Sequence, residues 1–207
     1  MPLNFEKKYY SKDIKFIVGV DEAGRGPLLG PVVAAAVILP HGFYDDSIND
    51  SKKLTVKKRE LAYEVIVKNA LDYGVGIVEA EEIDKINIYE AARLAMIKAI
   101  RSLKHPFDII LTDAMPLVSL HMPYEAIIKG DAKAECIAAA SIIAKVTRDR
   151  MMEELDKQYP NYGIKKHKGY GTKAHIEALN KYGPIPHVHR KTFHPVSDFY
   201  IEKTKLF

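Results

Sequence analysis

The chain has 207 residues, 47% hydrophobic and 28% charged, which suits a globular protein that buries one large core, with or without a small appendage. Its single cysteine, Cys136, excludes an internal disulfide and a cysteine-based zinc cluster, and it fits a reducing compartment. The formal net charge of +4 is only a weak indication of a polyanionic partner.

In chain order, the predicted elements begin with two strands. Residues 15–20 are a short run of apolar strand formers, and residues 32–39 (VVAAAVIL) predict a second buried strand. Between them, residues 21–27 hold two glycines and a proline and predict a loop. Apolar residues at helical spacing then predict a helix from residue 56 that is closed by Gly74.

The rest of the chain alternates between strands and helices. Strands are predicted at GVGIVEA, FDIILTD and PYEAIIKGD, and helices at residues 89–103 and 133–158. This interspersion predicts an α/β layered domain over residues 1–159 with a central mixed sheet. Residues 160–207 are rich in proline, glycine and histidine and predict a small appendage that is helical near 173–181.

No export or membrane signal is expected from these residues. The first residues, MPLNFEKKYYSKD, lack the apolar core of a secretory signal. The longest apolar run, residues 28–39, is too short to span a bilayer and is broken by Gly30 and Pro31. We therefore expect a cytoplasmic protein with no membrane partner.

Three of the predicted strands end at carboxylates. Asp21 and Glu22 follow the first strand, and Asp113 and Asp131 end two later ones. Ligands of open α/β sheets gather beyond strand ends, and four acids gathered there repel one another unless a cation lies between them. Oxygen ligands favour Mg²⁺ or a similar hard cation, and two such ions about 3.5–4 Å apart suit displacement at phosphorus.

Each acid also has an ordinary structural explanation. Asp131 precedes a predicted helix and fits an N-cap. Asp113 fits a turn before a proline, and Asp21 with Glu22 fits a solvated loop. The spacing along the chain leaves these alternatives open.

The glycines on both sides of Arg25 are a second candidate feature. The segment GRGPLLG (24–30) resembles a dinucleotide-binding loop only superficially, because its spacing is wrong and Pro27 and Pro31 prevent the helix that such a loop requires. The flanking glycines instead allow the backbone to approach a ligand closely, although a tight turn accounts for one of them.

Basic side chains provide candidate phosphate contacts. Residues 165–194 hold seven lysine or arginine residues against one acid, interleaved with Tyr170, Tyr182 and Phe193, and this mixture suits a nucleic-acid backbone with base or sugar stacking. The segment also contains His187, His189 and His194, for which a zinc site is an alternative. A further candidate contact, or else a helix-capping turn, consists of Ser51, Lys52 and Lys53.

Together these motifs resemble one known family. VDEAGRGP, NDSKKLT, IILTD, KGDAKAECIAAASIIAKVTRDR and HKGYGTKAHIEAL…HRKTFHPV, in this order from about residue 15 to 197, look like bacterial ribonuclease HII. The segment from Lys129 to Arg150 and the GRG after the acid pair are specific in combination, since the sister family ribonuclease HIII lacks that GRG. The implied fold is ribonuclease H-like: a mixed five-stranded sheet flanked by helices, with a mainly helical C-terminal appendage.

The resemblance also implies roles for individual residues. The catalytic, metal-binding acids would be Asp21, Glu22, Asp113 and Asp131. The loop whose backbone contacts the 2′-hydroxyl and the adjacent phosphate would be Gly24, Arg25 and Gly26. Tyr170 would pack against the deoxyribose after the ribonucleotide. Further phosphate contacts would come from Ser51, Lys52 and Lys53.

The implied activity is hydrolysis of the phosphodiester 5′ of a ribonucleotide, with Mg²⁺ or Mn²⁺ in a two-metal-ion mechanism. Substrates would be RNA–DNA hybrids and DNA duplexes with embedded ribonucleotides, as in ribonucleotide excision repair, and products would carry 3′-hydroxyl and 5′-phosphate ends. We expect a monomer. Two rival interpretations are a non-catalytic nucleic-acid-binding module and a DNA-only nuclease. One departure from the family is Ala114-Met115, where glycine and asparagine are common, and it could alter the local turn.

Overall fold

The computed structural model describes residues 4–49, 51 and 53–201, and its centre is a five-stranded sheet in the order β3-β2-β1-β4-β5. The strands are β1 (Ile17–Ala23), β2 (Val32–Ile38), β3 (Asp72–Val78), β4 (Ile109–Asp113) and β5 (Tyr124–Ile127). β2 pairs antiparallel with β1 and β3, whereas β4 pairs parallel with β1 and β5. The predicted mixed sheet is confirmed. Because β1, β4 and β5 are parallel, their carboxyl ends lie at one edge of the sheet.

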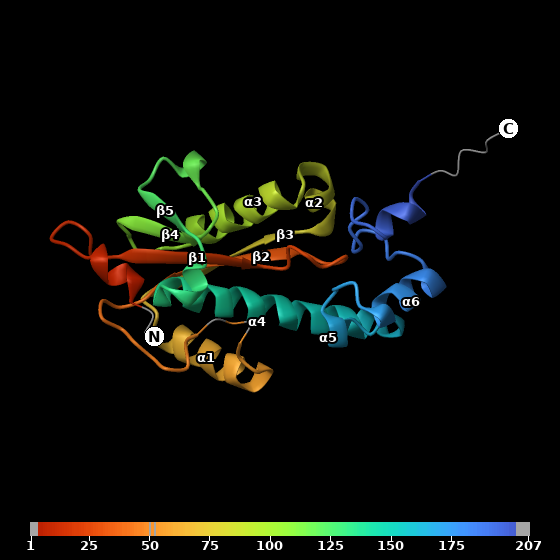
Figure 1. Ribbon diagram of the computed structural model, residues 1–207, viewed down its shortest axis with the longest axis horizontal. Coiled ribbons are helices and arrows are strands. Elements are labelled where there is room, and N and C mark those ends of the chain that lie inside the picture. The colour runs from red at the N-terminus through yellow and green to blue at the C-terminus, as the bar shows by residue number, and fades with distance from the viewer. Residues whose placement is uncertain (1–3, 50, 52, 202–207) are drawn as a thin grey trace.

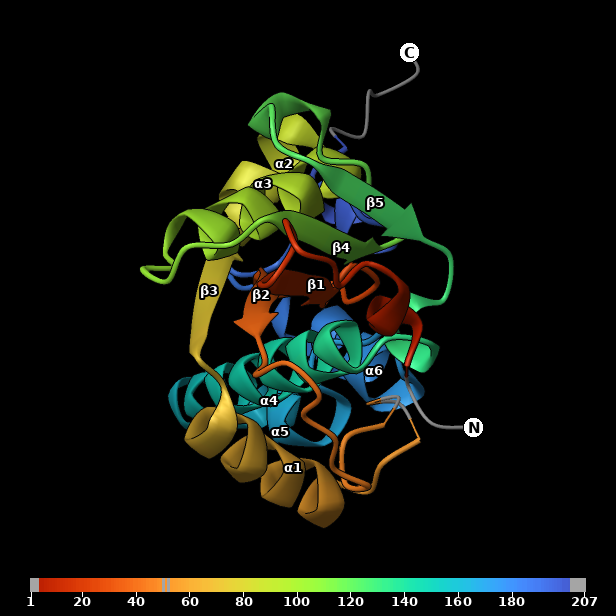
Figure 2. The same cartoon turned by 90° about the vertical axis from the view of Figure 1, so that its left-hand side faces the viewer.

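Helices cover both faces of this sheet (Figures 1 and 2). α3 (Ile88–Arg101) and α2 (Ala80–Ile86) lie on one face, and α4 (Glu135–Gln158) lies on the other with α1 (Val56–Asn69) beyond it. β2 is buried along its whole length because both of its faces are covered. α4 packs so closely over β1 that a Cβ at Gly19 would lie 2.1 Å from the carbonyl carbon of Cys136. This close packing holds the end of β1 against α4.

Several predicted boundaries were wrong. β5 ends at Ile127, so Asp131 does not end this strand but lies in the 3-10 helix Gly130–Ala132 that follows it. β1 continues through the two acids to Ala23, so they belong to the strand and not to a loop. The first helix ends at Asn69, and Gly74 lies inside β3, where a Cβ would meet the Ala99 carbonyl oxygen at 2.3 Å. α2 was not predicted. A short helix of this kind carries little periodic signal, because one or two turns do not repeat an apolar pattern.

The segment from residue 160 packs on the end of the sheet farthest from the N-terminus in Figure 1. Its helices are α5 (Ile164–His167) and α6 (Lys173–Tyr182), the latter confirming the predicted helix near 173–181. The Leu28 and Gly30 amides donate to the carbonyls of Gly169 and Val188, at 2.8 Å in each case. The short 3-10 helices are Phe5–Lys8, Val118–Leu120, Gly130–Ala132, Pro160–Tyr162 and Val196–Phe199. In the described part of the chain, no helix is long and apolar enough to cross a membrane.

Candidate active site

Three aspartates, at or just after the ends of three strands, meet at one edge of the sheet. One carboxylate oxygen each of Asp21, Asp113 and Asp131 lies within 4.8 Å of the other two. Asp21 lies near the end of β1, Asp113 is the last residue of β4, and Asp131 lies in the 3-10 helix after β5. Because β1, β4 and β5 run in parallel, their carboxyl ends converge, and residues 92 to 110 positions apart become neighbours.

None of the three aspartates has the ordinary structural role that its position in the sequence allows. Asp131 is not a helix cap, since the N-cap position of α4 is Ala134. Asp113 does not close a local turn, because its Oδ1 accepts a hydrogen bond of 2.8 Å from the distant amide of Gly130. Asp21 is 4% exposed and therefore does not belong to a solvated loop.

Glu22 adds a fourth carboxylate beside this trio. Its side chain is only 10% exposed, and its Oε1 lies 3.3 Å from the Nη1 of Arg25. Both residues line a cavity of about 220 Å³ that also contains carboxylates of the trio. The residues lining it are Asp21, Glu22, Ala23, Gly24, Arg25, Gly26, Ser51, Asp113, Ser141, Lys145 and Tyr170.

The electrostatics of the trio favour a bound cation. Burial raises the pKa of Asp21 well above its usual value, and the charges of Glu22 and Asp113 raise it further. A hydrogen bond from the Ser141 hydroxyl opposes this rise. An all-oxygen donor set of buried carboxylates suits a hard divalent ion, which would remove the repulsion that these acids otherwise carry.

The two glycines beside Arg25 have different structural reasons. Gly24 has a φ of +99°, and a Cβ there would lie 2.2 Å from the Nε of Arg148, so only glycine fits. Gly26 has no positive φ, and a Cβ there would meet only Tyr170, at an ordinary 3.6 Å. The protein's own packing therefore does not require glycine at position 26.

Tyr170 stands across the cavity from this loop. Its side chain is 45% exposed, and its main chain is held on both sides: its amide donates to the His167 carbonyl at 2.9 Å and its carbonyl lies 2.9 Å from the Nδ1 of His175. An exposed ring on a firmly held backbone is suited to stacking against a ligand.

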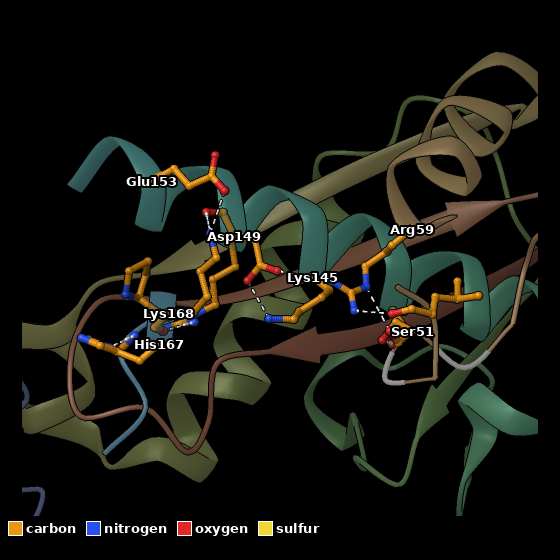
Figure 3. Close-up of polar contacts among 12 residues, drawn as sticks. Ser51, Arg59, Lys145, Asp149, Glu153, His167 and Lys168 are labelled. Carbon is orange, nitrogen blue, oxygen red and sulfur yellow. Dashed lines mark hydrogen bonds and ion pairs between the residues drawn. The ribbon is translucent and has the colours of Figure 1, made fainter. Parts of the chain in front are cut away.

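Sequence reasoning missed two polar residues of the cavity, Ser141 and Lys145. They lie one turn apart on α4, and Asp149 follows one turn later and accepts a 2.6 Å ion pair from Lys145. Figure 3 shows Lys145 and Arg59 meeting at Asp149. The available signal was polar residues at positions 141, 145 and 149, a spacing of four that places them on one face of the helix.

The predicted contacts at residues 51–53 divide into three cases. Ser51 lines the cavity, but it is only 4% exposed, and its hydroxyl lies 2.8 Å from that of Ser141. Arg59 fixes its carbonyl at 2.9 Å (Figure 3). Lys53 is exposed and does not line the cavity, and Lys52 lies outside the described residues. The cap of α1 is Thr55, whose hydroxyl accepts from the Lys58 amide.

The histidines considered as a zinc site do not converge in the described structure. His187 pairs with Glu81 at 2.6 Å, and His194 lies 3.3 Å from Asp198. His189 is buried, with its Nε2 3.2 Å from that of His175. Cys136 is buried, and burial raises the pKa of its thiol.

Comparison with known proteins agrees with this geometry. The family model for Ribonuclease HII matches residues 18–196. The chain belongs to the ribonuclease HII family. A Ribonuclease HII from Acholeplasma laidlawii is 58% identical over 94% of this chain and 95% of its own length, and one from Bacillus subtilis is 56% identical over 95% and 76%. The crystal structure of ribonuclease H2 from Pyrococcus horikoshii superposes with a TM-score of 0.76 at 31% identity, covering 89% of this chain and 96% of that one.

Membership of the ribonuclease HII family confirms the predicted fold class and makes the chain an enzyme of the ribonuclease H type. The departure after the third acid has a local consequence. Ala114 takes a φ of +55°, a left-handed backbone that glycine adopts at lower cost. The Asp113 side chain still lies beside Asp21 and Asp131 despite this departure.

Proposed function

We propose that this ribonuclease HII family member hydrolyses the phosphodiester on the 5′ side of a ribonucleotide, in RNA–DNA hybrids and in DNA with embedded ribonucleotides. The products carry 3′-hydroxyl and 5′-phosphate ends. The observation that carries the proposal is the convergence of carboxylate oxygens of Asp21, Asp113 and Asp131, two of which line one cavity with the loop 24–26 and Tyr170. A cation held by these acids would therefore lie close to a candidate reader of sugar and phosphate.

Asp21, Glu22, Asp113 and Asp131 would hold Mg²⁺ or Mn²⁺. The support is their all-oxygen chemistry and the repulsion that raises the pKa of Asp21. Two such ions, when bound, would supply an activated water and charge stabilisation at the leaving oxygen.

The other side chains of the cavity bind and orient the substrate. Arg25 is about half exposed beside Glu22 and is free to form charge-assisted hydrogen bonds with a phosphate. Lys145 lines the same cavity and adds a second cation, held in place by Asp149. The ring of Tyr170 would stack against the deoxyribose that follows the ribonucleotide.

Selectivity for ribonucleotides rests on the 2′-hydroxyl, the group that distinguishes RNA from DNA at a given site. Main-chain groups of Gly24, Arg25 and Gly26 would form hydrogen bonds with it. If deoxyribose enters, these polar groups lose their partner, so a DNA-only duplex is rejected. We further propose that residues 160–207 form a substrate-binding appendage, with Ser51, Lys52 and Lys53 close to the backbone, and that the enzyme works as a cytoplasmic monomer.

The decisive experiment compares two end-labelled duplexes of the same sequence, each in Mg²⁺ and in EDTA. A DNA duplex with a single ribonucleotide should be cut in Mg²⁺ on the 5′ side of that ribonucleotide, and the same duplex should stay intact in EDTA. An all-DNA duplex of the same sequence should stay intact in both. Cleavage of the all-DNA duplex would instead support a DNA nuclease. Binding without cleavage in any divalent ion would support a non-catalytic binding module.

A further inference from the structure

Two arginines are fully enclosed behind the loop that carries Arg25. Arg148 of α4 is 1% exposed and Arg190 of the appendage is 0% exposed. A buried cation is costly unless its donors are satisfied, yet neither arginine forms an ion pair with a carboxylate of the described chain. Main-chain carbonyls satisfy them instead.

The carbonyls that bind these guanidinium groups are concentrated in one segment, residues 24–31. The Nε, Nη1 and Nη2 of Arg190 donate to the carbonyls of Gly30, Arg25 and Gly24 at 3.0, 2.9 and 2.6 Å. Arg148 donates from the same three positions to Pro31, Lys168 and Leu29 at 2.9, 2.9 and 3.1 Å. Five of the six carbonyls therefore belong to the loop and its continuation into β2.

The hydrogen bonds to Arg190 also determine where the amides of this loop point. In a trans peptide the C=O and the following N–H point in opposite directions. Because the carbonyls of Gly24 and Arg25 turn toward Arg190, the amides of Arg25 and Gly26 turn away from it. Neither amide donates a hydrogen bond to another residue of the described chain, and both residues line the catalytic cavity.

We propose that Arg190, backed by Arg148, is a positioning residue that orients the amides of Arg25 and Gly26 for the 2′-hydroxyl and phosphate of the ribonucleotide. This inference rests on the proposed function, because it needs a ribonucleotide in the cavity. Successive amides aimed at one point form an anion-binding concavity, and the guanidinium behind them adds a positive field. Burial and the neighbouring Arg148 lower the pKa of Arg190 to about 9, which leaves it protonated at neutral pH.

The glycine pattern supports the same arrangement. The φ of +99° at Gly24 presents its carbonyl to Arg190, while a side chain there would collide with Arg148. The face of Phe193 covers the guanidinium of Arg190, 5.0 Å from the ring centroid, which completes its enclosure. The arginine reaches the loop from 165 positions away in the sequence, so the appendage takes part in building the cavity wall.

The test uses Arg190→Met and Arg190→Lys in the full chain, with Arg101→Met at an exposed site at the end of α3 as the matched control. Turnover is measured on the duplex with one ribonucleotide, below the melting temperature of every variant. We expect Arg190→Met to lower kcat by about tenfold or more with KM changed far less, since misdirected amides fail mainly in the transition state. Arg190→Lys should restore part of the loss, and Arg101→Met should match the wild type.

Chemical rescue of kcat is a second measurement, and no rescue is expected if Arg190 only stabilises the fold. Arg190→Ala removes the guanidinium, and added methylguanidinium should raise its kcat without raising that of the wild type. Unchanged kcat in a folded Arg190→Met protein would overturn the proposal. Unfolding of Arg190→Met, Arg190→Lys and Arg190→Ala would also overturn it, because it would show that Arg190 only stabilises the fold. If the wild type itself fails to cut the substrate, the proposed function fails instead.

Discussion

The Oδ1 of Asp113 accepts a hydrogen bond of 2.8 Å from the main-chain amide of Gly130, and this bond ties the end of β4 to the turn that carries Asp131. Two acids of the trio are thus fixed relative to each other by the backbone rather than by a metal. Burial and the charges of Glu22 and Asp113 raise the pKa of Asp21, so this arrangement carries an electrostatic cost that a bound cation would reduce.

Replacing Asp21 tests whether the acid trio (Asp21, Asp113 and Asp131) serves metal binding or stability of the fold. Asp21→Asn should abolish cleavage, and in EDTA it should melt at the same temperature as the wild type or higher, because a buried charge is removed. Mg²⁺ should raise the melting temperature of the wild type but not that of the variant, since a ligand stabilises only the state that binds it. Asp13→Asn, at an exposed site, is the control, and retained turnover in Asp21→Asn would refute the assignment.

The two glycines of the loop should respond differently to alanine. Gly26→Ala should leave the melting temperature nearly unchanged, because its Cβ meets only Tyr170 at 3.6 Å, and should lower kcat/KM by about tenfold or more by blocking close approach. Gly24→Ala should destabilise the protein, since its Cβ would lie 2.2 Å from Arg148. Thermal melts beside cleavage assays test both, and full activity in Gly26→Ala would contradict the assigned role.

Tyr170→Ala should weaken cutting of a single embedded ribonucleotide, because the ring is exposed in the cavity and is available for stacking. A loss of about 1–3 kcal/mol in transition-state binding corresponds to a fall in kcat/KM of roughly tenfold to a hundredfold. Tyr170→Phe keeps the stacking face and should remain close to the wild type. An unchanged rate in Tyr170→Ala would remove the tyrosine from the substrate site.

The buried pair His175 and His189 should make stability depend on pH. Burial lowers the pKa of each from 6.5 to about 4, so the unfolded chain binds more protons between these values. Their contribution is fully present above pH 6.5 and is lost as the pH falls toward 4, with a slope of at most about 1.4 kcal/mol per pH unit for each histidine. Urea unfolding at several pH values measures it. His175→Asn should reduce the slope, and an unchanged slope would contradict the assignment.

Ala114→Gly should stabilise the protein. The φ of +55° costs alanine roughly 1–2 kcal/mol, and the extra entropy of glycine in the unfolded chain returns part of that, so a net gain of up to about 1 kcal/mol is expected. Cleavage should be unchanged, because Asp113 already lies in the trio. A lower melting temperature would show that this backbone is not strained.

The sequence by itself determined the layered α/β fold and most of the elements, and it named the acids that were candidates for one site. Apolar runs and helical spacing are local properties, and they placed β2, α3, α4 and α6 within a few residues of the structure. The motifs in order were sufficient for the family. Element ends were less predictable, since β1 continues through its acids and Gly74 lies inside β3 to let α3 approach.

Only the tertiary structure decided which groups meet. In the sequence, Ser141 and Lys145 are simply polar residues of a helix, and only the packing of α4 shows that they line the cavity. In the same way, the sequence suggests that Ser51 is a surface contact, whereas its hydroxyl lies against that of Ser141. In the sequence, Arg190 is one of seven lysine or arginine residues in the basic segment 165–194. In the structure it is fully buried and donates hydrogen bonds to carbonyls of the loop before β2. Burial and hydrogen-bond partners depend on which distant segments pack together, and no local pattern of residues carries that information.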